Sequence, residues 1–191
     1  MRSAQVQRKT KETDIDLKLS VDGGEVKVDT GIGFFDHMLT ALAFYAGFGL
    51  ELTVKGDLEV DGHHTVEDTG LALGDALKEA LGDKKGIHRF GSAFVPMDEA
   101  LAFTALDFSG RPYLVFDAAM PQEHIGSYES CLTVEFMRAL SNRAGITLHQ
   151  KAFYGANAHH ITEALFKSLG MCMKQAVKVE GDSVTSTKGV L

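Results

Sequence analysis

Two five-residue words, HHTVE at 63–67 and HHITE at 159–163, decide the organisation of this chain. Upstream of the first word stands His37, followed after four, five, nine and ten residues by Ala, Leu, Ala and Gly. Upstream of the second stands Glu135, followed at the same offsets by the same four residue types. The gap from this point to the HHxxE word differs between the copies by two residues. Such agreement predicts an internal duplication. The predicted division of the chain is two repeats, about 1–90 and 91–180, and a C-terminal tail at 181–191.

The periodicity of apolar residues is similar in the two halves. Alternation at 15–21 predicts a half-buried strand, and a Gly-rich turn at 22–24 followed by 26–28 predicts the return strand of a hairpin. The stripe after HHTVE has a helical period and contains Gly70 and Gly74. Each glycine costs a helix about 1 kcal/mol relative to Ala, so we expect close packing at both. The other predicted elements are helices at 35–46, 63–81, 134–143 and 158–179, and strands at 50–54, 101–108, 112–118 and 146–152.

Length and composition favour one globular domain. The chain has 191 residues, of which 45% are hydrophobic and 24% charged, as is ordinary for such proteins. Together with the order of elements, this predicts an α+β fold. We expect an internally duplicated unit with two similar halves, each a β-sheet covered by helices.

Charge and apolar content argue against several functional classes. No run of about 18 apolar residues is present, which excludes a transmembrane helix. The N-terminus lacks the apolar core of a signal peptide, so we expect a cytoplasmic protein. A net charge of −7 argues against general nucleic-acid binding through phosphate contacts. In that compartment, Cys131 and Cys172 are expected to be reduced core thiols.

The paired histidines predict metal binding. At a helix start, the Glu of HHxxE lies three residues after one His and four after the other, so both pairs project from one side. Adjacent histidines diverge by about 100° around a helix, so we expect each to serve a different metal. Imidazole with carboxylate suits a divalent transition metal without selecting one. The candidate ligands are His37, His63, His64, Glu67, Glu135, His159, His160 and Glu163.

Cationic residues are candidates for binding an anion such as phosphate. Lys167 follows Glu163 by four residues and therefore extends from the same helix face as the metal ligands. A polar segment at 186–189 is expected to close over a ligand. The cationic candidates are Arg89, Arg111, Lys167 and Lys188. Weaker acidic candidates are Glu12, Asp98 and Glu99, whereas His88, His124 and His149 fall outside the repeat and are expected to be structural.

Several longer motifs carry a family resemblance. They include GIGFFDHML (31–39), GDLEVDGHHTVEDTGLALGDAL (56–77), DFSGRPYLVF (107–116), HHITEALFKSLG (159–170) and STKGVL (186–191). In these the chain resembles the imidazoleglycerol-phosphate dehydratase family of histidine biosynthesis, over essentially its whole length. The resemblance implies a fold of the ribosomal protein S5 domain 2-like type and the conversion of imidazole glycerol phosphate to imidazole acetol phosphate with loss of water. It also implies two Mn²⁺ ions per active site, formed where subunits meet in a twenty-four-subunit octahedral homo-oligomer, and the monofunctional form without a fused phosphatase.

The resemblance also assigns roles to positions of this chain. It places metal ligands at His37, His63, His64, Glu67, His159, His160 and Glu163. Glu135 stands where the family often has a histidine, and because a carboxylate suits Mn²⁺ we expect ligation there to survive. Phosphate-binding positions match Arg89, Arg111, Lys167, Ser186 and Lys188. Glu12 matches an acidic position that contacts substrate, and Asp98 is a further candidate for substrate contact.

The implied reaction sets a chemical problem that the metals would solve. The proton to be removed lies on the carbon attached to the imidazole, with no neighbouring carbonyl to acidify it. Coordination of the imidazole nitrogens favours the imidazolate, so that a diazafulvene-type intermediate can form as hydroxide leaves. We assign the proton transfers to Glu163 and Glu12, with Glu67 as the next candidate.

Two other functional classes remain open from the residues alone. A dinuclear metallohydrolase acting on a phosphoester would use the same metals to activate water, and it would release phosphate from generic substrates. A metal-storage or scaffold protein would use the histidines to assemble a shell. Such a protein has no need of four cations and a polar tail near the site.

Overall fold

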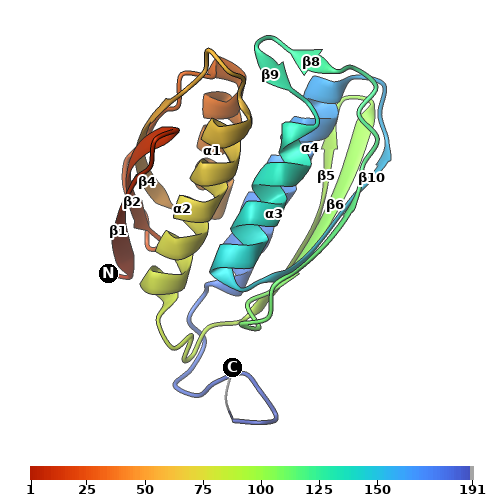
Figure 1. The fold of residues 1–191 in the computed structure, drawn as a ribbon. Helices are drawn as coiled ribbons and strands as arrows, with labels where there is room; N and C mark the ends of the chain where they lie inside the picture. The colour runs from red at the N-terminus through yellow and green to blue at the C-terminus, as the bar shows by residue number, and fades with distance from the viewer. Residues whose placement is uncertain (190–191) are drawn as a thin grey trace.

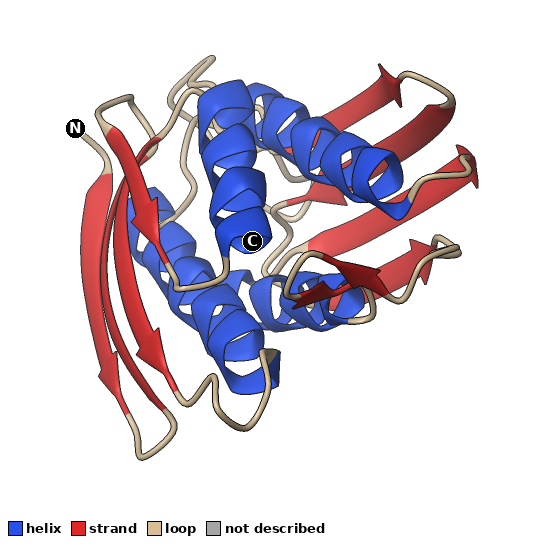
Figure 2. Cartoon of the chain, turned by 90° about the horizontal axis from the view of Figure 1, so that it is seen from above, coloured by secondary structure: helices blue, strands red, loops and turns tan. Residues whose placement is uncertain are grey.

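Two β-sheets face each other across a layer of four helices (Figures 1 and 2). The structure is a computed structural model and describes residues 1–189. Both halves of the chain run strand–strand–strand–helix–strand–helix, with a small extra hairpin in the second. The predicted α+β duplication is therefore confirmed, while the limits of the two halves stay a prediction. Residues 190 and 191, the last two of the predicted tail, lie outside the described residues.

The two sheets have the same strand order. The first is β1-β2-β4-β3 and the second is β5-β6-β10-β7. In each, the strand between the two helices is parallel to the edge strand beside it and antiparallel to the strand on its other side. The first sheet consists of β1 (Ser3–Lys9), β2 (Thr13–Ser20), β3 (Val26–Asp29) and β4 (Gly49–Gly56). The second consists of β5 (Phe90–Met97), β6 (Ala100–Asp107), β7 (Tyr113–Asp117) and β10 (Thr147–Tyr154), and β8 (His124–Ile125) pairs with β9 (Tyr128–Glu129).

The predicted hairpin between 15–21 and 26–28 is wrong. β4 lies between β2 and β3, so β3 pairs in parallel with β4 and makes no ladder with β2. Gly23 and Gly24, with φ of 102° and 148°, carry the chain past Gly49, whose Cα would lie 3.2 Å from a Cβ on Gly24. Alternation indicates which side chains face the core, but it does not indicate which strand is the neighbour.

The pattern of apolar residues does not predict the edge strands β1 and β5. The inward positions of β5 are Gly91, Ala93 and Val95, and the buried residue of β1 is Ala4. Small side chains give a weak alternation signal, because the period of a strand is read from the contrast between its two faces.

All four helices begin at the same end of the molecule, the top in Figure 1. Parallel strands end at the same edge of a sheet, so α1 and α2, which follow β3 and β4, start at one edge. The pair β7 and β10 has the same consequence for α3 and α4. The helices are α1 (Gly33–Ala46), α2 (His63–Leu81), α3 (Leu132–Ala144) and α4 (Ala158–Ala176), the last ending before the predicted residue 179.

The expected close packing at the helix glycines is confirmed. A Cβ on Gly70 would lie 2.8 Å from the Cβ of Ala139, and one on Gly74 would lie 2.6 Å from the Cβ of Arg143. Both contacts join α2 to α3. Glycine therefore lets the two helices approach more closely than side chains would allow, which compensates for its low helix propensity.

The two cysteines differ in environment. Cys172 is buried in the core, as predicted, and burial raises the pKa of its thiol to about 12. Cys131 is exposed just before α3, so its prediction as a core thiol is wrong. No helix among residues 1–189 is long and apolar enough to cross a membrane.

Candidate functional site

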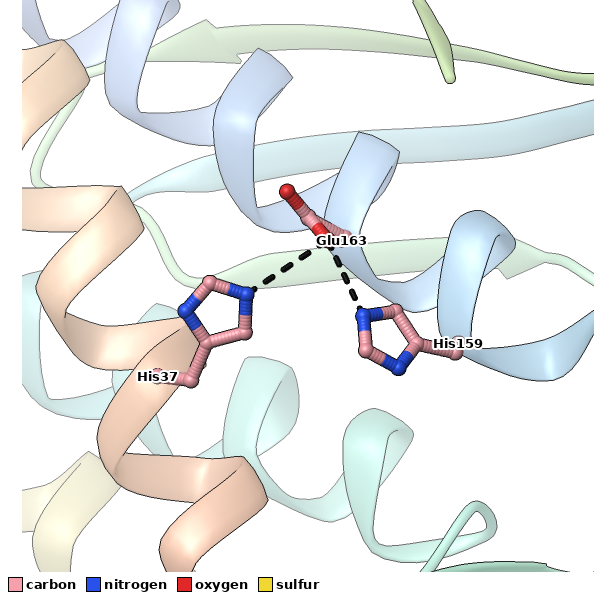
Figure 3. A group of neighbouring side chains, drawn as sticks. All are labelled: His37, His159 and Glu163. Carbon is pink, nitrogen blue, oxygen red and sulfur yellow. Dashed lines mark hydrogen bonds and ion pairs between the residues drawn. The ribbon is translucent and has the colours of Figure 1, made fainter. Parts of the chain in front are cut away.

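Three side chains from α1 and α4 converge at the end where the helices begin (Figure 3). One carboxylate oxygen of Glu163 lies 3.1 Å from Nε2 of His159 and 3.5 Å from Nε2 of His37. One ligand atom from each of the three residues lies within 4.8 Å of the others. The HHxxE spacing accounts for the contact between His159 and Glu163, one helical turn apart, whereas His37 arrives through packing of α1 on α4.

Local contacts fix the start of α4. The side chain of Asn157 caps the helix by accepting a hydrogen bond from the backbone N–H of His159, at 2.9 Å. The ring of Phe34 packs edge-on against the His159 imidazole, with centroids 4.9 Å apart. The imidazole is therefore held against α1, facing the carboxylate of Glu163.

Lys167 holds Glu163 in its ionised form. Its ammonium lies 2.6 Å from the Glu163 oxygen that faces away from the histidines, and the Glu163 side chain is only 7% exposed. Burial alone would raise the pKa of Glu163, but the hydrogen bond and charge of Lys167 outweigh it and hold that pKa below its usual value. The same contact raises the pKa of Lys167. Glu163 thus presents an anionic oxygen to both imidazoles.

The repeat-equivalent group, which consists of His63 and Glu67 on α2 and Glu135 on α3, is less closely assembled. Nε2 of His63 lies 3.4 Å from the carboxylate of Glu67, which is 46% exposed. Glu135, on α3, forms an ion pair with Arg138 one turn later. Among residues 1–189, only His37, His159 and Glu163 bring three potential ligands together. The predicted ligands of the other group therefore lie at the same end of the molecule without forming an equivalent cluster.

The second histidine of each HHxxE motif, His64 or His160, is oriented differently from the first. The rings of His63 and His64 are 6.2 Å apart at 87°, and those of His159 and His160 are 6.0 Å apart at 76°. The predicted divergence of adjacent imidazoles is therefore confirmed, while their assignment to different metals stays a prediction.

Each of these second histidines lies between two carboxylates. Nδ1 of His64 lies 3.0 Å from Asp57, and its Nε2 lies 3.7 Å from Glu12. Hydrogen bonding to Asp57 raises the pKa of His64. Nδ1 of His160 lies 2.6 Å from Glu99, and its Nε2 lies 3.6 Å from Asp98; hydrogen bonding to Glu99 raises the pKa of His160.

Sequence reasoning missed Asp57 and gave Glu99 little weight. Asp57 lies within the motif GDLEVDGHH but outside any periodic pattern. Its relation to His64 depends on how the loop after β4 folds back on α2, which no local signal reveals. Asp98, predicted to contact substrate, lies at the histidine end of the molecule, together with Lys167.

A second, cationic site lies at the opposite end. A cavity of about 690 Å³ is lined by Arg89, Phe90, Arg111, Thr185, Ser186, Thr187 and Lys188. Four of the predicted phosphate-binding residues therefore line one cavity. Arg89 is held in place by two hydrogen bonds to Asp107, of 2.6 and 3.0 Å, and by one to the backbone oxygen of Thr185. We call this site the anion cavity.

The anion cavity and the histidine cluster are far apart within one chain. The backbone N–H of Arg89 donates to the carbonyl of Ala176, the last residue of α4. Glu163 lies near the start of that helix, and a rise of about 1.5 Å per residue separates the two by about 20 Å. Of the five predicted phosphate-binding residues, Lys167 is the one that lies near the histidines.

Of the three histidines outside the repeat, His88 has contacts that tie two segments of the chain together. His88 lies 2.7 Å from Glu180, and its backbone N–H donates to the carbonyl of Lys178. These bonds tie the segment after α4 to the start of the second half. His88 therefore supports the chain that leads to the anion cavity, in keeping with its predicted structural role.

Comparison with known proteins gives a consistent result. The family model for imidazoleglycerol-phosphate dehydratase matches residues 30–173. A protein of that name from Acetivibrio thermocellus is 55% identical over 193 residues, covering 100% of this chain and 99% of its own length. Another from Carboxydothermus hydrogenoformans is 54% identical, covering 100% of both chains.

Solved structures agree in fold. The crystal structure of imidazoleglycerol-phosphate dehydratase from Staphylococcus aureus matches with a TM-score of 0.85 and 37% identity, covering 93% of this chain and 99% of that one. The structure of the enzyme from Pyrococcus furiosus matches with a TM-score of 0.85 and 41% identity, covering 97% and 100%. Taken together with the duplicated fold and the histidine cluster, these matches show that the chain belongs to the imidazoleglycerol-phosphate dehydratase family.

Proposed function

We propose that this chain is a hydro-lyase that converts imidazole glycerol phosphate to imidazole acetol phosphate with loss of water, a step of histidine biosynthesis. Membership of the family supports the reaction. The observation that carries the proposal is the convergence of His37, His159 and Glu163 in a chain that also has an anion cavity. An imidazole that carries a phosphate needs both kinds of site.

The residues of the cluster fit a divalent transition metal. Two imidazole nitrogens and a carboxylate oxygen lie within 4.8 Å of one another, a donor set that suits such an ion. We propose Mn²⁺, two ions per active site. When bound, it would supply a Lewis acid that favours the imidazolate form of the substrate on the way to a diazafulvene-type intermediate. The proposed ligands are His37, His63, His64, Glu67, Glu135, His159, His160 and Glu163.

The anion cavity is proposed to hold the phosphate. Arg89 is already paired with Asp107, so its charge is largely balanced and its main contribution is a fixed position. Arg111 and Lys188 form no ion pair within residues 1–189, so their charge is available to a phosphate. Ser186 adds a hydroxyl group beside them. Anchoring the phosphate would fix the position of the reacting carbon.

Glu12 and Glu163 are proposed for the proton transfers. The Glu12 side chain is 53% exposed and lies 3.7 Å from Nε2 of His64, where a ligand can reach it. Glu163 has one oxygen occupied by Lys167, which leaves the oxygen that faces the histidines to hold a proton or a metal. Glu67, in the equivalent position of the first half, is the next candidate.

Assembly would bring the two sites together. A small metabolite cannot bridge the distance of about 20 Å between the histidine cluster and the anion cavity of one chain. We propose that the cavity of one subunit faces the histidine end of another, with Lys167 contributing to the phosphate from the histidine side. This agrees with active sites at subunit interfaces in a cytoplasmic homo-oligomer of twenty-four subunits. Light scattering of the purified protein measures the particle mass.

Chelator-stripped protein provides the direct test. We expect no dehydration of imidazole glycerol phosphate without metal and full activity after addition of Mn²⁺. Inactivity with Mn²⁺, Fe²⁺ and Zn²⁺ in a folded and assembled protein would overturn the proposal. Release of phosphate from generic phosphoesters, without dehydration, would instead indicate a metallohydrolase.

A further inference from the structure

The second histidines of the two HHxxE words have a common environment that the duplication alone does not produce. In both, Nδ1 bonds a carboxylate while Nε2 faces a more exposed one. Asp57 and Glu99 occupy the Nδ1 side of His64 and His160. Glu12 and Asp98, 53% and 73% exposed, occupy the Nε2 side.

The carboxylates on the Nδ1 side come from non-equivalent positions. Glu12 and Glu99 correspond, because each directly precedes the second strand of its sheet. Asp57 directly follows β4, and its counterpart after β10 is Gly155, which has no side chain to offer. The carboxylate beside Nδ1 therefore comes from the residue after β4 in the first half. In the second half it comes from the turn between β5 and β6. The same contact recurs although the residue positions differ.

Glu99 is held in place by three hydrogen bonds. One of its oxygens accepts the backbone N–H groups of Ala156 and Asn157, at 3.0 and 2.9 Å, and the other lies 2.6 Å from Nδ1 of His160. Both oxygens of Glu99 are therefore used as hydrogen-bond acceptors. A carboxylate in this arrangement can only accept, so Nδ1 of His160 must carry the hydrogen. In the neutral imidazole the lone pair is then on Nε2.

We propose that Asp57 and Glu99 are positioning residues that fix the Nδ1–H tautomer of His64 and His160 and so direct the Nε2 lone pair of each toward the metal. The inference rests on the proposed metal binding by these histidines. A carboxylate behind a metal-binding imidazole sets its tautomer and ring orientation, and it increases the basicity of the free nitrogen. Glu12 and Asp98 are then left on the side where metal and substrate would bind.

An amide in place of Glu99 cannot reproduce these contacts. Both carboxylate oxygens accept hydrogen bonds, whereas the side chain of Gln has one oxygen and one NH₂ group. In Glu99→Gln the NH₂ group must face either two backbone N–H groups or Nδ1. In the second arrangement Nδ1 must accept a hydrogen bond, so the ring hydrogen moves to Nε2. Nε2 then has no lone pair with which to bind the metal.

Mn²⁺ titration of chelator-stripped protein, with free Mn²⁺ measured by electron paramagnetic resonance, tests the proposal. Wild type, Glu99→Gln, Asp57→Asn and the control Asp61→Asn are compared. Asp61 is at the same end and accepts the backbone N–H of His63 at 2.7 Å, a bond that Asn can retain. We expect Glu99→Gln and Asp57→Asn each to weaken one class of site about 10- to 100-fold, with the control unchanged.

Nitrogen-15 NMR of histidine-labelled, metal-free particles provides a readout that does not involve metal. We expect wild-type His160 and His64 to carry the hydrogen on Nδ1, and Glu99→Gln to move it from Nδ1 of His160. Wild-type affinity in both variants, or an Nε2–H tautomer in wild type, would overturn the inference. Absence of Mn²⁺ binding by wild type would instead overturn the proposed function. If Glu99→Gln fails to fold, the Mn²⁺ affinity of Asp57→Asn and the histidine tautomers of wild type still test the inference.

Discussion

The two HHxxE words lie at the start of equivalent helices but in different surroundings. In the second half, Glu163 is 7% exposed, bonded to Lys167 and faced by His37. In the first half, Glu67 is 46% exposed, and Leu71 stands where Lys167 stands in the second. The words supply the same donors, but their neighbours determine whether a three-residue group forms within one chain.

The third candidate donor also differs between the two groups. His37 on α1 faces Glu163 with a neutral or cationic imidazole, whereas Glu135 on α3 is an acid that pairs with Arg138. An additional carboxylate beside Glu67 would repel it unless a cation intervened. His37, His159 and Glu163 therefore form a three-residue group within one chain, whereas Glu67 and Glu135 belong to no such group among residues 1–189.

Replacement of Glu163 should have the largest effect. We expect Glu163→Gln to lower kcat by about 10²- to 10⁴-fold, the usual contribution of general acid–base catalysis, while the particle remains assembled. The measurement is turnover of imidazole glycerol phosphate at saturating Mn²⁺. Glu67→Gln, compared under the same conditions, shows whether the more exposed glutamate has the smaller role. Substantial turnover by Glu163→Gln would remove Glu163 from proton transfer.

Replacement of Lys167 should have the next largest effect. Lys167→Met leaves Glu163 buried without its cation, so we expect a loss of about 1–3 kcal/mol in the free energy of unfolding, measured with urea. In wild type, the pKa of Glu163 is below its usual 4.5. Its contribution to stability is therefore complete above that pH and is lost as pH falls through the folded-state pKa.

Without Lys167, the pKa shift of Glu163 should change from a decrease to an increase. Burial then dominates and raises the pKa of Glu163, so Mn²⁺ binding should be lost at a higher pH than in wild type. The measurement is the Mn²⁺ affinity of wild type and of Lys167→Met between pH 5 and pH 8. An unchanged pH profile in a folded Lys167→Met variant would show that Lys167 does not control the charge of Glu163.

Glu135→His would make the two halves more alike. The variant places an imidazole on α3 at the position that corresponds to His37 on α1 in the repeat. Because imidazole suits zinc better than a carboxylate does, we expect the ratio of Zn²⁺ to Mn²⁺ affinity to rise by about tenfold, measured by competition titration. Arg138→Ala is the companion variant, since it frees Glu135 without changing its chemistry. An unchanged ratio in Glu135→His would argue against ligation at this position.

Leu71→Lys should have the smallest effect. It gives Glu67 a lysine one turn later, as Glu163 has, but on a more exposed surface. Such a pair stabilises a helix by about 0.2–0.5 kcal/mol, and its contribution should decrease with added salt. Urea unfolding at low and high ionic strength measures it. A gain that does not depend on salt would indicate improved packing rather than an ion pair.

The strand pattern shows how far sequence reasoning extends. Alternation at Ile15, Leu17 and Leu19 identified the core face of β2, and these side chains are at most 2% exposed. It did not identify the partner of β3, because strand pairing is decided between segments that are distant in sequence. The same limit applies to Cys131, which was expected in the core but is exposed just before α3.

The sequence by itself determined the donors and their local geometry. The four-residue spacing of His159 and Glu163 places them one helical turn apart in any α-helix, whatever surrounds it. The repeated offsets established two similar halves, and the motifs established the family. These features depend on helix periodicity and on residue identity, which are local properties.

Only the tertiary structure decided which donors meet. His37 reaches Glu163 because α1 packs on α4, and Asp57 reaches His64 because the loop after β4 returns to α2. The structure also placed Arg89 beside Ala176, the last residue of α4, and Lys167 beside Glu163, which contacts the histidines, although the family resemblance predicts phosphate binding for both. Such long-range approaches are set by how sheets and helices bury their apolar faces, and no local pattern encodes that arrangement.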